Sequence, residues 1–156
     1  MTLGLALAIG GAALAACAGI GSALGVGIAG EAGAGVMAED PKKFGQTLVL
    51  QALPGTQGIY GLLIAFLILV KTGVMGGSPL ELTTTQGLYF LFAGAPVGLV
   101  GIWSGWAQGK TAAAGIMLVA KRPSELAKAI IYAAMVETYA ILSLLISFLM
   151  WMFIEV

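Results

Sequence analysis

The sequence lacks histidine and has few charged residues. Histidine is absent from all 156 positions, and only 9% of the residues are charged, with a formal net charge of zero. Without histidine, the chain has neither the commonest metal-binding side chain nor the usual general base near neutral pH. Without an excess of basic residues, nothing in the sequence points to nucleic acid. Soluble domains carry about 25% charged residues, so this composition argues against a soluble protein.

Cysteine occurs once, as Cys17, which excludes a disulfide within the chain and favours a small packing residue. The residues Leu14 to Cys17 read LAAC, similar to a lipoprotein cleavage site, but no basic residue precedes them. A signal peptide has a positively charged start, and the glycine-rich pattern here continues past Cys17. We therefore expect this segment to be kept as part of a helix.

Apolar residues make up 60% of the chain and gather in four long runs. Each run is long enough for the roughly 20 apolar residues that a helix needs to cross a bilayer. We expect an all-α membrane protein with four transmembrane helices, at about 2–37, 45–70, 86–119 and 127–154. Polar breaks containing proline and lysine follow the first and third runs, and a Gly/Ser/Pro/Thr segment at 72–85 is predicted to form the central loop.

An internal repeat appears when the chain is aligned with itself, without gaps, at a shift of 82 residues. The matched pairs include Gly19 with Gly101, Ser22 with Ser104, Pro41 with Pro123 and Leu62 with Leu144. The chain is therefore predicted to be two tandem duplicated helical hairpins, residues 1–75 and 83–156, joined by a connecting loop at 76–82. At the same shift Glu137 aligns with Gly55, so only the second hairpin carries a carboxylate at this position.

Basic residues concentrate at the two predicted hairpin tips. They are Lys42, Lys43, Lys121, Arg122 and Lys128. The positive-inside rule predicts that both tips face the cytoplasm and that both termini lie outside the cell membrane.

Small residues recur at four-residue spacing in the first and third runs. One stripe contains Gly21, Gly25, Ala29 and Gly33, and the other Gly101, Gly105 and Gly109. Such stripes let membrane helices approach closely. Two interpretations follow: packing within one four-helix bundle, or a tight inner ring built from many copies, which the length of both stripes favours.

Two charged residues and the three tryptophans inside or near the runs also allow an interpretation. Glu31 and Lys110 are expected to pair with each other or to extend to the lipid headgroups. Trp151 is predicted to lie at the membrane interface, and Trp103 and Trp106 to be packing residues.

Glu137 is the one acidic residue within the second and fourth runs that lies far from an end. A charge at this depth costs at least ~2.5–3.5 kcal/mol, so it marks a functional site by default. Gln57, Gln108 and Glu137 lie 16, 15 and 14 residues from the proline of the adjacent tip. At 1.5 Å per residue, these three side chains share one depth, roughly 21–24 Å from the tips.

The residues around this depth offer oxygen ligands and a single negative charge. Thr56 adjoins Gln57, and Tyr60 follows one turn later on the same face. Pro54 kinks the helix and can aim a backbone carbonyl, such as that of Leu53, into the site. One carboxylate balances one monovalent cation, and the oxygen ligands exceed what a proton requires, so the site favours Na⁺ over H⁺.

Three segments together resemble the rotor-ring proteolipids of V-type ATPases, the c-type subunits, including the duplicated ones of bacterial sodium-pumping enzymes. The segments are LPGTQGIYG at 53–61, WAQGKTAAAG at 106–115 and MVETYAILSLLISFL at 135–149. The resemblance covers nearly the whole chain. It implies Na⁺ ligation by the Leu53 carbonyl, Thr56, Gln57, Gln108 and Glu137, with Tyr60 hydrogen-bonded to the Glu137 carboxylate.

The resemblance also implies partners. These are identical copies in a membrane ring of about ten, surrounding lipid, a stator subunit that supplies an arginine, and a central-stalk subunit at the hairpin tips. No phosphate-binding loop follows a strand, so this chain is expected to be a non-catalytic subunit without an ATP site.

Three alternatives stay open at this point. The same rotor role could carry H⁺ instead of Na⁺. The chain could be a free-standing cation channel or transporter. Finally, Glu137 could be a protonated hydrogen-bond donor in a structural bundle.

Overall fold

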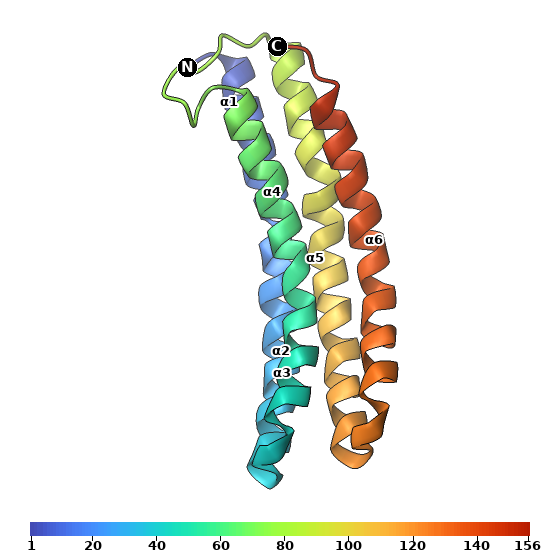
Figure 1. Cartoon of the computed structure of the whole chain (residues 1–156). Coiled ribbons are helices and arrows are strands. Elements are labelled where there is room, and N and C mark those ends of the chain that lie inside the picture. The colour runs from blue at the N-terminus through green and yellow to red at the C-terminus, as the bar shows by residue number, and fades with distance from the viewer.

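The computed structural model describes all 156 residues and is entirely helical (Figure 1). Four helical segments are long and apolar enough to cross a membrane: Leu3–Glu39, Pro41–Lys71, Thr84–Lys121 and Pro123–Met152. The prediction of an all-α membrane protein with four transmembrane helices is confirmed. Both hairpin tips lie at one end of the bundle, and both termini and the central loop lie at the other (Figure 1).

The first span consists of two helices, α1 (Leu3–Ala16) and α2 (Ala18–Glu39), which meet at Cys17. Helix α1 begins where the Thr2 hydroxyl accepts a hydrogen bond from the Leu5 amide at 3.2 Å. At the junction the Cys17 amide is shared between the Ala13 and Leu14 carbonyls, at 3.2 and 3.1 Å. The apolar run predicts one helix, and this local change of hydrogen bonding divides it.

The second span is interrupted at Pro54, as the sequence indicated. A 3₁₀ turn at Pro41–Lys43 leads into α3 (Phe44–Ala52), a second 3₁₀ turn covers Leu53–Gly55, and α4 follows (Thr56–Lys71). Proline has no amide hydrogen and cannot continue the α-helical hydrogen bonding. The tighter turn that results carries Leu53 and begins the candidate site.

The second half contains α5 (Thr84–Lys121) and α6 (Leu126–Met152), with a 3₁₀ turn at Pro123–Glu125 between them. Thr83 and Gln86 form a capping box that starts α5. The loop before it turns at two glycines with positive φ, Gly73 at 75° and Gly77 at 73°. Only glycine adopts this conformation readily.

The two small-residue stripes face each other inside one chain. A β-carbon built on Gly105 would lie 2.5 Å from the Gly21 carbonyl carbon, and one built on Gly25 would overlap the Gly105 backbone. Helix α2 therefore packs directly on α5, backbone against backbone. The stripes are thus used for packing within the bundle, and a ring of copies is not needed to explain them.

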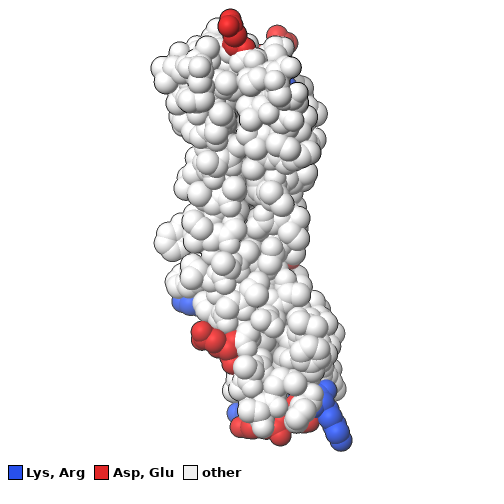
Figure 2. Space-filling model, turned by 90° about the vertical axis from the view of Figure 1, so that its left-hand side faces the viewer, with Lys and Arg blue, Asp and Glu red and all other residues white.

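Charged side chains gather toward the two ends of the molecule, and the face between them is almost entirely uncharged (Figure 2). Of the two alternatives expected for Glu31 and Lys110, pairing with each other is not found, because the one ion pair in the structure joins Lys128 to Glu125. Lys110 instead places its Nζ 3.5 Å from the centroid of the Trp106 ring. Trp103, which the sequence predicts to be a packing residue, is 68% exposed in the single chain.

Candidate functional site

Three oxygen atoms lie close together where the 3₁₀ turn at Leu53–Gly55 passes into α4. The Thr56 hydroxyl donates to the Leu53 carbonyl at 3.1 Å and lies 3.5 Å from the Gln57 side-chain oxygen. The Gly58 amide donates to the Ser22 hydroxyl of α2 at 2.8 Å. Ser22 thereby attaches this turn to the neighbouring helix.

Two buried glutamines connect α4 to α5. Neither Gln57 nor Gln108 has any exposed surface. The Gln57 amide nitrogen, Nε2, donates to the Gln108 oxygen at 2.5 Å, and the Gln108 nitrogen donates to the Ala133 carbonyl of α6 at 3.1 Å. Buried polar groups are costly unless they are hydrogen-bonded, so this network sets how three helices meet.

Glu137 is half-buried on α6, and both of its carboxylate oxygens accept hydrogen bonds. The Tyr60 hydroxyl donates to Oε1 at 2.5 Å, and the Gln108 nitrogen lies 3.4 Å from Oε2. Tyr60 and Gln108 therefore contact Glu137 directly. Gln57, Thr56 and Leu53 are connected to them through the hydrogen bonds described above. All six candidate residues belong to one hydrogen-bonded cluster.

The cluster holds one negative charge with no basic partner. The one ion pair in the structure is at the hairpin tip, between Lys128 and Glu125. No group of three or more histidine, cysteine or acidic residues comes together anywhere in the chain. A single carboxylate among amide, hydroxyl and carbonyl oxygens matches a monovalent hard cation in charge and in ligand type.

Sequence reasoning missed Ser104 as a member of this cluster. Its hydroxyl accepts a hydrogen bond from Gln57 Nε2 at 3.3 Å and donates to the Val136 carbonyl at 3.2 Å. Two signals could have identified it. Ser104 lies four residues before Gln108, on the same helical face, and it aligns with Ser22 in the repeat.

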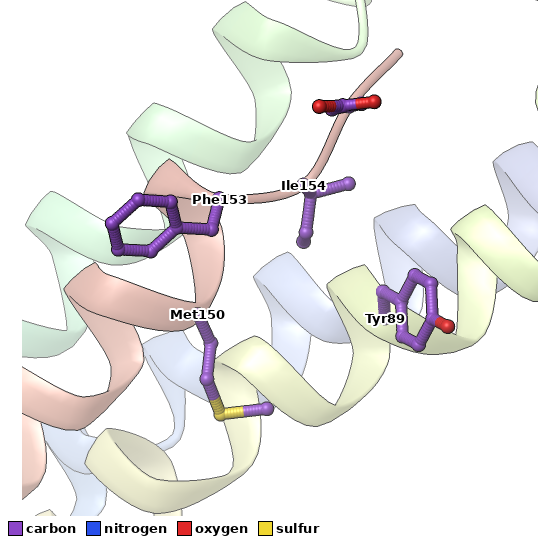
Figure 3. A pocket seen from close by; sticks show the side chains of 5 residues that line it. Tyr89, Met150, Phe153 and Ile154 are labelled. Atoms are coloured by element: carbon purple, nitrogen blue, oxygen red, sulfur yellow. The ribbon is translucent and has the colours of Figure 1, made fainter.

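A surface groove of the molecule lies away from this cluster. It has a volume of about 450 Å³ and is lined by Tyr89 of α5 and by residues 150 and 153–155 near the C-terminus (Figure 3). Met150 lies 13 residues beyond Glu137 along α6, or roughly 20 Å away. This mainly apolar groove is separate from the polar cluster.

Comparison with known proteins agrees with this arrangement. The family model described as that of the ATP synthase C subunit matches two segments, residues 3–68 and 91–150. The chain is 55% identical over 132 residues to the V-type sodium ATPase subunit K of Enterococcus hirae, covering 85% of this chain and 81% of that protein.

A more distant relative is the A-type ATP synthase subunit K of Methanocaldococcus jannaschii. The identity is 43% over 143 residues, which cover 92% of this chain and 60% of that protein. The family match spans most of the chain, and the Enterococcus relative aligns over most of both lengths. The chain therefore belongs to the ATP synthase C-subunit family, whose members form membrane rings.

Proposed function

We propose that this chain is the ion-carrying rotor-ring subunit of a V-type ATPase and binds one Na⁺ at Glu137. Ring rotation, coupled to ATP hydrolysis in a separate soluble sector, would carry the ion across the membrane. The observation that carries this proposal is the continuous hydrogen-bonded cluster that joins Glu137 to Tyr60 and the two buried glutamines. The relative from Enterococcus hirae, named for a sodium ATPase, supports Na⁺ as the cargo.

The number of oxygen groups favours Na⁺ over H⁺. A proton on Glu137 needs one acceptor, whereas a sodium ion needs several oxygen ligands. We assign these ligands to the Leu53 carbonyl, Thr56, Gln57, Gln108 and Glu137. Tyr60 would hold the carboxylate in place. The same rotor carrying H⁺ is the second candidate, since one carboxylate suffices for a proton.

The charge balance determines where in the transport cycle the site can be empty. A site with Na⁺ bound is neutral and can face lipid, whereas an empty carboxylate at this depth costs at least ~2.5–3.5 kcal/mol. The empty site is therefore confined to the stator, where a cationic side chain would displace Na⁺ from Glu137. This chain has one arginine, Arg122 at a hairpin tip, so the displacing arginine must come from the stator subunit.

The energy that the soluble sector must supply is modest for each ion. Moving one charge against 100 mV requires about 2.3 kcal/mol. A ring of identical copies passes its sites one by one through the stator, so each step moves one Na⁺ per chain.

The proposed assembly uses the two ends of the bundle differently. Each chain consists of two duplicated hairpins, residues 1–75 and 83–156, joined by the loop at 76–82. The second hairpin provides the ion-binding carboxylate, Glu137. The basic tips face the cytoplasm of a cell-membrane enzyme, by the positive-inside rule, and contact the central stalk. Both termini lie outside.

Carbodiimide labelling of the intact complex tests the proposal. The reagent modifies Glu137, and millimolar Na⁺ at fixed pH should protect it, while the same concentration of choline should not. Labelling that responds to pH but not to Na⁺ would support the H⁺ rotor instead. Purified protein in liposomes should give no ²²Na⁺ flux, and flux without stator or ATPase would identify a free-standing channel or transporter.

A further inference from the structure

We propose that Ser104 is a positioning residue of the ion site, and that its hydroxyl fixes which way the Gln57 amide faces. This inference rests on the proposed function, because it concerns how a Na⁺ ligand is held. A glutamine side chain ends in one oxygen and one nitrogen of nearly equal size. Only the oxygen can bind a cation. In one orientation of the amide Gln57 therefore coordinates Na⁺, and in the other its N–H groups point at the ion and repel it.

The orientation follows from a chain of donors and acceptors that starts on α6. The Ala133 carbonyl and the Glu137 carboxylate accept hydrogen bonds and cannot donate them. Both face the Gln108 nitrogen, at 3.1 and 3.4 Å. The Gln108 oxygen is therefore turned toward Gln57, and it accepts from Gln57 Nε2 at 2.5 Å.

Ser104 provides the second hydrogen-bond acceptor for the same Gln57 nitrogen. Its hydroxyl proton is directed at the Val136 carbonyl, 3.2 Å away, so a lone pair remains to accept from Gln57 Nε2 at 3.3 Å. Both hydrogens of the Gln57 amide are then used on the α5 side. The amide oxygen is left facing the hydroxyl of Thr56, another proposed ligand, which itself donates to the Leu53 carbonyl.

Burial keeps water from replacing the hydrogen bond between Ser104 and Gln57. Ser104 is 6% exposed and Gln57 is fully buried, so water cannot replace the hydroxyl without entering the bundle. If the hydroxyl is removed, one hydrogen of the Gln57 amide loses its acceptor. The free-energy difference between the two orientations of the amide then becomes smaller, and the orientation with the nitrogen toward the ion is populated more often. Ser104 would act through Gln57 and need not touch the ion.

The test compares Ser104→Ala with a matched control in the intact complex. Ser143 is a good control because it is almost equally buried, at 7%, and its hydroxyl donates only to Ala140 of its own helix, at 2.7 Å. We measure the Na⁺ concentration that halves carbodiimide labelling of Glu137. Ser104→Ala should raise this concentration about three- to tenfold, the effect of one hydrogen bond, and Ser143→Ala should leave it unchanged.

Three further measurements separate positioning from a general loss of structure. The pH dependence of labelling without Na⁺ should be the same in Ser104→Ala as in the unaltered complex, because a proton does not need Gln57. In a Gln57→Leu background, Ser104→Ala should have no additional effect on Na⁺ protection. Ser104→Cys, which fills the space with a weak acceptor, should bind Na⁺ as poorly as Ser104→Ala.

Several results would overturn the inference. These are unchanged Na⁺ protection in Ser104→Ala, full recovery in Ser104→Cys, or additive effects with Gln57→Leu. Absence of Na⁺ protection in the unaltered complex is a separate result that would reject the proposed Na⁺ site itself.

Discussion

The Tyr60 hydroxyl lies 2.5 Å from Glu137 Oε1, although 77 residues separate the two in the chain. Tyr60 belongs to α4 in the first half and Glu137 to α6 in the second. The site therefore uses both halves of the chain, even though the residue that aligns with Glu137 in the first half is a glycine, Gly55. A hydrogen bond to a charged group holds that group in one rotamer and in one place.

Replacing Tyr60 with phenylalanine should weaken Na⁺ binding without displacing the helices. The variant keeps the ring and loses one hydrogen bond to a charged group, worth about 1.5 kcal/mol, or roughly a tenfold change in affinity. The Na⁺ concentration that halves carbodiimide labelling should rise by that factor. Tyr139→Phe is the control, because Tyr139 is 68% exposed on the same helix as Glu137. An equal effect in both variants would argue against a specific role for Tyr60.

Replacing Glu137 with glutamine should abolish ATP-driven Na⁺ uptake into inverted vesicles while the ring stays assembled. The amide cannot become negatively charged, so neither Na⁺ release nor the interaction with a stator arginine remains. Glu31→Gln should keep transport within about twofold, because Glu31 is exposed on α2, away from the hydrogen-bonded cluster. Normal transport by Glu137→Gln would instead support the structural bundle with a protonated glutamate.

Replacing Gly105 with alanine should destabilise the folded chain. The added β-carbon would lie 2.5 Å from the carbonyl carbon of Gly21, so α2 and α5 must separate, at a cost of about 1–3 kcal/mol. Gly45→Ala should have the opposite effect, since nothing lies within 4 Å of that position and alanine favours a helix. Thermal unfolding of the isolated chain in detergent measures both. A higher melting temperature for Gly105→Ala would contradict the direct contact.

Replacing Lys71 with methionine should loosen the end of α6. Lys71 donates to the Trp151 and Met152 carbonyls at 2.9 and 3.2 Å, and its Nζ lies 5.0 Å from the centroid of the Trp151 ring. A cation at a helix C-terminus stabilises it by roughly 0.3–1 kcal/mol. Hydrogen exchange should therefore accelerate in the last turn of α6. Lys128→Met is the control and should leave that turn unchanged, because Lys128 pairs only with Glu125 at the opposite end.

Composition and spacing were sufficient to predict the four spans, the interruption at Pro54 and the level at which the polar residues lie. The reason is geometric. A helix rises by a constant amount per residue, so positions counted from Pro41 and Pro123 give depth directly. The repeat likewise indicates one candidate ion site per four helices, because Glu137 aligns with Gly55.

The rotation of each helix about its axis, and therefore which side chains face one another, is seen only in the tertiary structure. Membrane helices are apolar on all sides, so their sequences say little about rotation or about the choice of neighbour. For this reason the prediction of a packed Trp103 is wrong for the single chain, and Lys110 lies over Trp106 instead of pairing with Glu31. The same packing brings Ser104 against Gln57, a contact between residues 47 positions apart in the chain. The depth of the site is a property of the sequence, and the orientation of its ligands is a property of the packed bundle.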